Sequence, residues 1–397
     1  MKKRTLLHLA LSCVWFAALP TRAADPIAVA PEAAVSEAFG HYFKRHVADE
    51  DITGAAFVVV TADGIVRLGT AGYTDTNHQQ PITDRTVFRV ASVSKTFAAG
   101  LAAVLVQEGR FRWDDRVVDF VPGFHLKGDA SLVRVEDLLG QSTGLIPHAY
   151  DNLLEDGVPL AQIRQRYRDL SYICPPGDCY SYQNGVFSLI EPVIEKSTAQ
   201  DYAALMAQKI FRPLEMHDAS VGYKAFLASP GHALPHVKRH GRWTAVPVEP
   251  NYYRVAPAAG VNASISDMAQ WLIAQLGGRP SVLPPATIAT LTTPRVKTAR
   301  ELYRKYWRDL LTDAHYGLGW RIYDLGGHEL VYHSGWVSGF RADVAWSPEY
   351  GIGLAVLMNV EGTAISELST AFWQMAFRQL PPAKAAQRGT LVASSGH

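Results

Sequence analysis

The sequence is poor in cysteine and in net charge, and it contains no long basic run. Three cysteines occur in 397 residues, and 38 basic against 37 acidic side chains leave a formal charge of +1. Such a balance disfavours nucleic acid and membrane surfaces as main partners. Hydrophobic residues nevertheless make up 48% of the chain, which is typical of a globular protein with a large core. The length fits two or three domains, or one large two-lobed domain.

The N-terminus combines basic residues with an apolar stretch, and no other segment approaches a membrane span. Basic residues at 2–4 precede an apolar segment at 6–19, and small residues stand before a potential cut after Ala23. Residues 1–23 are therefore predicted to be a secretory signal peptide, whose apolar segment is too short to span a membrane. Lipid modification at Cys13 is disfavoured, because alanine rather than leucine stands three places before it. We expect export to the periplasm without stable membrane insertion.

The two remaining cysteines, Cys174 and Cys179, flank the turn-forming residues 175–178. An even pair in an exported chain indicates a disulfide, because the compartment is oxidising. The turn between them lets the two ends approach closely enough for the bond. Two free thiols, or half of a zinc site, are the alternatives.

The apolar pattern predicts strands near both ends of the chain and mainly helices between them. A helix is expected at 31–48, a hairpin at 55–60 and 65–69 with Asp-Gly at its turn, strands at 319–323, 329–333, 340–346 and 352–358, and a last helix at 364–380. No internal repeat or linker is evident. We therefore expect an α/β (α+β) fold in a single two-lobed domain, residues 24–380. One antiparallel sheet would be built from about 50–75 and 316–360, with a helical lobe inserted at about 90–300. The tail, 381–397, is predicted to be disordered.

Ser92 and Lys95 are the first candidates for chemistry. If Ser92 opens a helix, Lys95 lies one turn later on the same face, within hydrogen-bond reach of the serine hydroxyl. The apolar run at 97–106 predicts that this helix is buried. Burial would lower the pKa of the lysine and make it a base for the serine. The alternative is a helix-capping serine followed by a solvated lysine.

Two further motifs follow in order, Tyr182-Gln183-Asn184 and His333-Ser334-Gly335. Together with Ser-x-x-Lys, they resemble the motifs of the penicillin-recognising serine hydrolases, which include class C β-lactamases, D-alanyl-D-alanine peptidases and β-lactamase-like esterases. The resemblance extends from about Glu50 to Leu380. It implies the β-lactamase/transpeptidase-like fold.

Two near matches to these motifs are set aside. Tyr150-Asp151-Asn152 lacks the Pro-Gly loop that precedes Tyr182. Lys297-Thr298-Ala299 lacks the glycine of the third motif, and we expect it to lead into a basic, aromatic segment rather than a strand.

The resemblance also implies roles for the individual residues. Ser92 would attack the carbonyl, and Lys95 with Tyr182 would share its proton. Asn184 would hold an amide of the substrate, and the backbone N–H groups of Ser92 and Trp336 would form the oxyanion hole. No cofactor is implied.

Two positions depart from class C β-lactamases and put efficient β-lactam turnover in question. His333 stands where lysine is usual, and with Ser334 and Gly335 it would bind a substrate carboxylate. Because histidine titrates near neutrality, we expect the positive charge at this position to vary with pH. The bulky Trp336 is expected to narrow the pocket entrance or make it aromatic.

A metal site formed by His232, His236 and His240 is disfavoured. Pro235 interrupts the helix that their spacing would need, and zinc requires three or four convergent ligands. We expect no metal.

Three functions remain open. The favoured one is a periplasmic serine β-lactamase acting through an acyl-enzyme on Ser92. The second is a D-alanyl-D-alanine carboxypeptidase or small-ester hydrolase with the same residues, and the third is a penicillin-binding sensor that is acylated without turnover. Each takes a small-molecule substrate, and the protein is expected to be a monomer.

Overall fold

A computed structural model describes residues 30–77 and 80–383. The predicted signal peptide with Cys13, and the predicted disordered tail from residue 384 on, lie outside the described residues. Within these ranges, no helix has both the length and the apolar character needed to cross a membrane.

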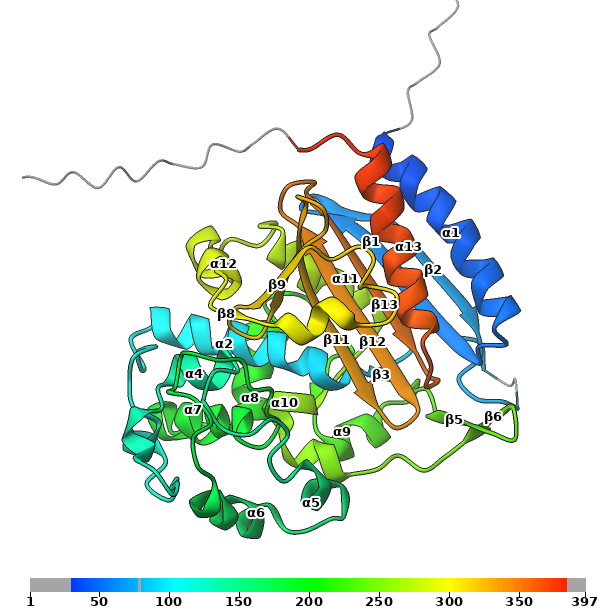
Figure 1. Cartoon of the computed structure of the whole chain (residues 1–397). Coiled ribbons are helices and arrows are strands. Elements are labelled where there is room, and N and C mark those ends of the chain that lie inside the picture. Colours follow the sequence, from blue (N-terminus) through cyan, green and yellow to red (C-terminus); the bar gives the residue numbers. More distant parts are fainter. Residues whose placement is uncertain (1–29, 78–79, 384–397) are drawn as a thin grey trace, which may run out of the picture.

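An eight-stranded antiparallel sheet forms the centre of the molecule (Figure 1). In spatial order its strands are β2 (Gly64–Gly72), β1 (Gly54–Thr61), β13 (Ile352–Met358), β12 (Phe340–Ser347), β11 (Glu329–Val337), β10 (Arg321–Asp324), β9 (Asp313–Tyr316) and β8 (Val296–Lys297). In chain order the first strand, β1, pairs with the last, β13, from Ala55 opposite Met358 to Thr61 opposite Ile352. The predicted antiparallel sheet built from both ends of the chain is thus confirmed.

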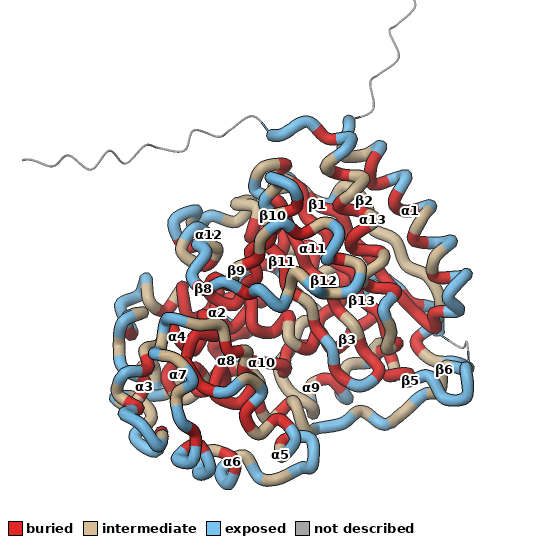
Figure 2. Tube along the Cα trace, viewed as in Figure 1, coloured by how far each residue is buried: buried red, intermediate tan, exposed pale blue. Residues whose placement is uncertain are grey.

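Two helices from opposite ends of the chain cover one face of the sheet (Figure 1). They are α1 (Pro31–Asp49) and α13 (Ala364–Gln379), both close to their predicted ranges. Phe39 of α1 lies between Phe57 of β1 and Phe372 of α13, with ring centroids 5.0 and 5.1 Å away. This layer buries the apolar stripes of both helices (Figure 2).

The other face is covered by α11 (Ile265–Gln275), which packs on β1, β12 and β13. The apolar helix α2 (Ser94–Gln107) packs behind it, with Phe97 stacked on Trp271 at 4.3 Å between ring centroids. Gly100 allows this close approach, because a Cβ there would lie 2.7 Å from the Trp271 ring. The expected buried helix after Ser92 is therefore present.

The segment between β2 and β8 is mainly helical. Its other α-helices are α3 (Val117–Phe120), α4 (Val135–Leu139), α5 (Asp151–Glu155), α6 (Leu160–Arg166), α7 (Ile190–Thr198), α8 (Tyr202–Met206), α9 (Tyr223–Ala228), α10 (Ala256–Ala259) and α12 (Pro285–Thr292). It also contains five short strands that were not predicted: β3 (Phe88–Arg89), β4 (Ser220–Val221), β5 (His236–Arg239), β6 (Arg242–Ala245) and β7 (Val261–Ala263). Strands of two to four residues are too short to show an alternating pattern in the sequence.

Lys297 is the last residue of the two-residue strand β8 at the edge of the sheet, and it leads into the 3-10 helix η7 (Ala299–Tyr303) rather than into a further strand, as expected. Its Nζ pairs with Asp313 at 3.1 Å, and its side chain is largely exposed.

Replacing Phe39 by alanine should destabilise the fold, because the side chain is fully buried between the sheet and α13. The expected loss in free energy of unfolding is about 3–5 kcal/mol, measured by denaturant titration. Lys44→Ala, on the exposed side of α1, is the matched control and should change it by no more than about 0.5 kcal/mol. Equal effects of the two substitutions would contradict the packing described.

Candidate active site

Ser92 lies in a short 3-10 turn, η1 (Ala91–Val93), immediately before α2. It therefore precedes the helix rather than opening it. Ala91 has a φ of 49°, which is uncommon for a residue with a side chain and marks a locally strained turn. Gly335 of β11 packs against this turn, since a Cβ there would lie 2.1 Å from the Val90 carbonyl oxygen. The glycine brings the serine turn and β11 into direct contact.

Lys95 is fully buried one turn after the serine. Its Nζ lies 3.1 Å from Ser92 Oγ. It also donates to Asn184 Oδ1 at 2.8 Å and to the Ala258 carbonyl at 3.1 Å. Burial lowers the pKa of Lys95, although Tyr182 opposes this shift. A neutral amine satisfies the two carbonyl-type acceptors with its two hydrogens and leaves its lone pair for the serine hydroxyl.

Tyr182 lies beside the lysine. Lys95 Nζ is 4.7 Å from the centroid of the tyrosine ring, and the guanidinium carbon of Arg321 is 5.5 Å from it. The predicted disulfide, Cys174–Cys179, is present just before this tyrosine. The structure thus brings the first two predicted motifs together.

Asn184 is held at both ends of its amide. Its Oδ1 accepts from Lys95, and its Nδ2 donates to Asp151 Oδ2 at 2.8 Å. Asp151 belongs to the Tyr-x-Asn sequence that was set aside. Tyr150 itself points elsewhere, with its hydroxyl donating to the Arg166 carbonyl at 3.1 Å. The substrate contact of Asn184 stays a prediction.

His333 is fully buried, and this corrects the expectation that its charge changes near neutrality. Its Nδ1 donates to the Ser334 carbonyl at 2.9 Å, and its Nε2 lies 3.1 Å from the Tyr316 hydroxyl and 3.3 Å from Arg321 Nη1. Burial, together with the charges of Arg321 and Lys95, lowers the pKa of His333 well below its usual range. His333 is therefore neutral over the working range.

Arg321, on β10, carries the permanent charge beside His333. Burial disfavours that charge, but Glu301 and nearby tyrosines keep the pKa of Arg321 above its ordinary value. The Glu301 carboxylate lies 3.3 Å from the Arg321 guanidinium and also accepts from Tyr323. This arginine could not be predicted from the sequence, because its proximity to His333 depends on strand pairing between β10 and β11.

Trp336 does not narrow the site, so that expectation was also wrong. Side chains alternate along β11, which places Tyr332, Ser334 and Trp336 on the face opposite Gly335. The indole is 61% exposed, and the guanidinium carbon of Arg341 stacks 4.7 Å from its ring centroid. It lines a separate hollow of about 420 Å³. The predicted role of the Trp336 backbone N–H is independent of this side-chain position and stays a prediction.

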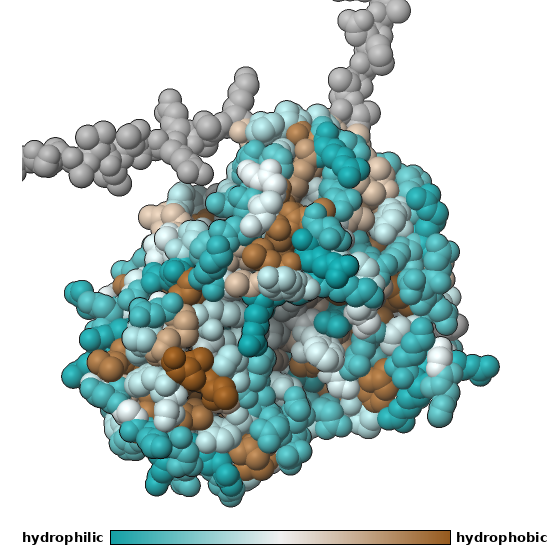
Figure 3. Space-filling model, viewed as in Figure 1, coloured by the Kyte–Doolittle hydropathy of each residue, from teal (hydrophilic) through white to brown (hydrophobic). Residues whose placement is uncertain are grey.

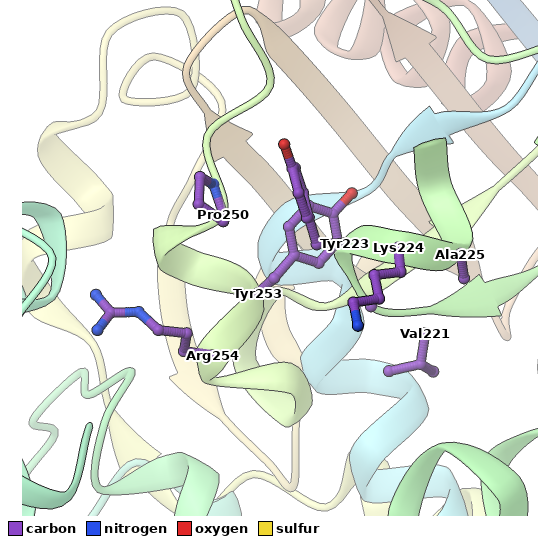
Figure 4. Close-up of a pocket in the computed structure, with 8 residues that line it drawn as sticks. Val221, Tyr223, Lys224, Ala225, Pro250, Tyr253 and Arg254 are labelled. Atoms are coloured by element: carbon purple, nitrogen blue, oxygen red, sulfur yellow. The ribbon is translucent and has the colours of Figure 1, made fainter. Parts of the chain in front are cut away.

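A further hollow, of about 520 Å³, lies beside the segment that supports the lysine (Figure 4). Its lining residues are Val221, Gly222, Tyr223, Lys224, Ala225, Pro250, Tyr253 and Arg254. The rings of Tyr223 and Tyr253 lie 5.7 Å apart and are side by side in this view. Chain residues 251–254 lead directly into α10, which carries the Ala258 carbonyl. The surface is also hollowed between the strands and the helical segment near the middle of Figure 3.

Of the three histidines considered as metal ligands, two are hydrogen-bonded to backbone carbonyls and the third lies in a turn. His232 Nδ1 bonds to the Ser229 carbonyl at 2.8 Å, and His236 Nδ1 to the Asn359 carbonyl at 3.0 Å. His240 lies at the turn between β5 and β6. In residues 30–77 and 80–383, no group of three or more His, Cys, Asp or Glu side chains could hold a metal ion.

The beta-lactamase family model matches residues 39–372, a range that includes all three motifs. The chain belongs to the beta-lactamase family. Its serine, buried lysine, tyrosine and third-motif strand occupy one site, as expected for a serine hydrolase of that family.

The curated relatives that the chain matches are distant in sequence. The chain is 27% identical over 295 residues to the unguisins hydrolase ungD' of Aspergillus campestris, covering 70% of this chain and 53% of that protein. It is 25% identical over 330 residues to protein flp of Staphylococcus aureus, covering 80% and 61%. The chain thus spans between about half and three fifths of these relatives.

Solved structures share the fold. The octameric penicillin-binding protein homologue from Pyrococcus abyssi has a TM-score of 0.75 at 24% identity, covering 87% of this chain and 79% of that one. SurE has a TM-score of 0.68 at 22% identity, covering 89% and 76%. The β-lactamase/transpeptidase-like fold implied by the motifs is therefore confirmed.

Reducing the disulfide should lower turnover more than stability. Only five positions separate Cys174 from Cys179, so the bond restricts the unfolded chain less than the roughly 3 kcal/mol expected for a fifteen-residue loop. The bond closes the loop that leads to Tyr182, and the Gly177 N–H attaches this loop to the Ser142 carbonyl at 2.7 Å. Steady-state rates and Tm with and without reductant test this. The Cys174→Ser/Cys179→Ser double variant should not respond to reductant, and a large drop in Tm with unchanged turnover would contradict the assignment.

The pH profiles of kcat/KM for carboxylate-bearing substrates and for uncharged esters should have the same shape around pH 6.5. Protonation of His333 would require a pH well below that value, and Arg321 keeps its charge throughout. An extra limb near pH 6.5 for carboxylates alone would show that His333 titrates after all. As a control, the Arg321→Gln/Glu301→Gln double variant removes Arg321 together with its buried carboxylate partner. Arg304, which also pairs with Glu301 at 3.3 Å, keeps its contact with the Tyr332 hydroxyl. The double variant should raise KM for carboxylates more than for esters.

Proposed function

We propose that this protein is a periplasmic serine β-lactamase that opens the β-lactam amide through an acyl-enzyme on Ser92. The observation that carries the proposal is the geometry of Lys95, a buried amine 3.1 Å from the serine hydroxyl. Burial lowers the pKa of Lys95 and so favours the neutral, basic form, while two acceptors on the other side of Nζ hold it in place. The distant relationship to a protein named as a hydrolase supports the reaction class.

Acylation begins with proton transfer from Ser92 Oγ to Lys95 Nζ as the oxygen bonds to the β-lactam carbonyl carbon. Tyr182, whose ring adjoins the lysine, passes the proton to the ring nitrogen as the amide bond breaks. The backbone N–H groups of Ser92 and Trp336 stabilise the charge that develops on the carbonyl oxygen. No cofactor is required.

Substrate is proposed to lie along the exposed edge of β11. Strand β10 pairs with β11 only from Glu329 to Tyr332, so residues 333–337 extend beyond it beside the serine turn. Backbone groups on such an edge bind an extended amide substrate. Arg321, near this edge, offers a positive charge to its carboxylate.

A D-alanyl-D-alanine carboxypeptidase or small-ester hydrolase is the second candidate. It is favoured by the neutral His333, because class C β-lactamases carry a lysine there. A penicillin-binding sensor would use the same acylation chemistry and stop before hydrolysis. In each case the partner is a small molecule, the chain acts as a monomer after export, and neither nucleic acid nor stable membrane insertion is involved.

Incubation of the mature protein with a chromogenic β-lactam should give one covalent adduct that maps to Ser92. Ser92→Ala should abolish both adduct and turnover, because no other residue supplies the nucleophile. Intact mass and peptide mapping measure the adduct, while parallel assays with a D-alanyl-D-alanine peptide and a nitrophenyl ester rank the substrates. Labelling that persists in Ser92→Ala would exclude this serine as the nucleophile, and faster turnover of peptide or ester would favour the second candidate.

A further inference from the structure

A histidine and a carboxylate form a pair at the edge of the site. His148 Nδ1 lies 2.8 Å from Asp151 Oδ2. The histidine side chain is 60% exposed, whereas that of Asp151 is only 12% exposed. A carboxylate can only accept, so in the neutral imidazole the proton lies on Nδ1 and the lone pair on Nε2. In the part of the chain that the structure describes, no side chain or backbone group is hydrogen-bonded to Nε2.

This pair is linked to the catalytic lysine by an unbroken series of hydrogen bonds. Asp151 Oδ2 accepts from Asn184 Nδ2 at 2.8 Å as well as from His148. Asn184 Oδ1 in turn accepts from Lys95 at 2.8 Å. The series ends at Ser92, 3.1 Å from the lysine nitrogen. Asp151 therefore fixes both the histidine and the asparagine that contacts the lysine.

His148 is also held directly against the tyrosine of the site. Its ring centroid lies 5.5 Å from that of Tyr182, and its backbone N–H donates to the Tyr182 carbonyl at 2.8 Å. The imidazole thus meets solvent on one side and the catalytic tyrosine on the other. A base in this position lies between solvent and the catalytic tyrosine, where it can accept a proton from water that enters beside Tyr182.

We propose that His148, oriented by Asp151, is the base that activates the water for hydrolysis of the acyl-enzyme. This rests on the proposed function, because it requires an ester on Ser92. The site then has two bases with separate tasks. Lys95 serves the serine during acylation, and His148 serves water during deacylation.

The proposed step conserves atoms and protons. His148 Nε2 takes one proton of the water as its oxygen bonds to the acyl carbon. The bond from that carbon to Ser92 Oγ breaks, and Oγ takes a proton from the Lys95 and Tyr182 pair. The proton on His148 returns to this pair through solvent, so that product acid and free enzyme are released.

Stopped-flow assays with a chromogenic β-lactam separate the two steps. In His148→Gln the acylation burst should stay within about twofold of wild type, while steady-state turnover should fall by about 10²-fold or more. Acyl-enzyme on Ser92 should then accumulate in intact-mass spectra. His41→Gln is the matched control, because His41 is also an exposed histidine beside a carboxylate, 3.1 Å from Glu37 on α1, and it should leave both phases unchanged.

Chemical rescue tests the base directly. His148→Gly suits the backbone, because residue 148 has a φ of 57°. Added imidazole should enter the space left at this exposed position and restore part of the turnover without changing the burst. A merely structural role for His148 would give no such rescue.

Several results would overturn the proposal. If burst and turnover fall together in His148→Gln, the residue positions Tyr182 rather than activating water. Unchanged turnover would remove it from the reaction altogether. Stable acylation of the wild-type protein without hydrolysis would contradict the role of His148 and leave acylation of Ser92 intact. Failure of every substrate to label Ser92 would reject the proposed function, and this inference with it.

Discussion

The burial of Lys95 beside Ser92 is the constraint on which the rest of the site depends. An ammonium group without water is costly, so the fold must either neutralise it or surround it with acceptors. Here both occur, because burial lowers the pKa of the lysine while Asn184 and the Ala258 carbonyl accept its hydrogens. Helix α2, the Tyr182 loop and α10 each contribute one side of this arrangement. Their packing therefore determines the chemistry of the serine.

The sheet does not carry the nucleophile. It contributes the positive charge of Arg321 and the contact of β11 with the serine turn. Gly335 lets β11 press against the strained turn at Ala91, which fixes the serine relative to the strand. On the same strand, His333 is neutral and bonds to its neighbours, while Arg321 of the adjacent strand supplies the cation. The site thus combines a helical segment that carries Ser92, Lys95 and Tyr182 with a sheet edge along which we propose that the substrate binds.

Local signals predicted much of this arrangement, and tertiary contacts decided the rest. The alternation of apolar residues located the long strands and both terminal helices, and motif order located Ser92, Lys95 and Tyr182. The charge state of His333 could not be read in the same way, because it depends on burial and on an arginine of the paired strand. The orientation of the Trp336 side chain, by contrast, follows from the alternation of side chains along β11. Asp151 was not predicted, because the motif around Tyr150 lacks the Pro-Gly loop that precedes Tyr182, and its contact with Asn184 depends on tertiary packing.

The protonation state of Lys95 tests the central claim most directly. Lysines labelled with ¹³C at Cε can be titrated by NMR, and the signal of Lys95 can be assigned by its loss in Lys95→Met. The account predicts that this lysine loses its proton at a pH clearly below the ordinary value of about 10.4, while exposed lysines titrate normally. A Lys95 signal that titrates with the exposed lysines would contradict its role as the base for Ser92.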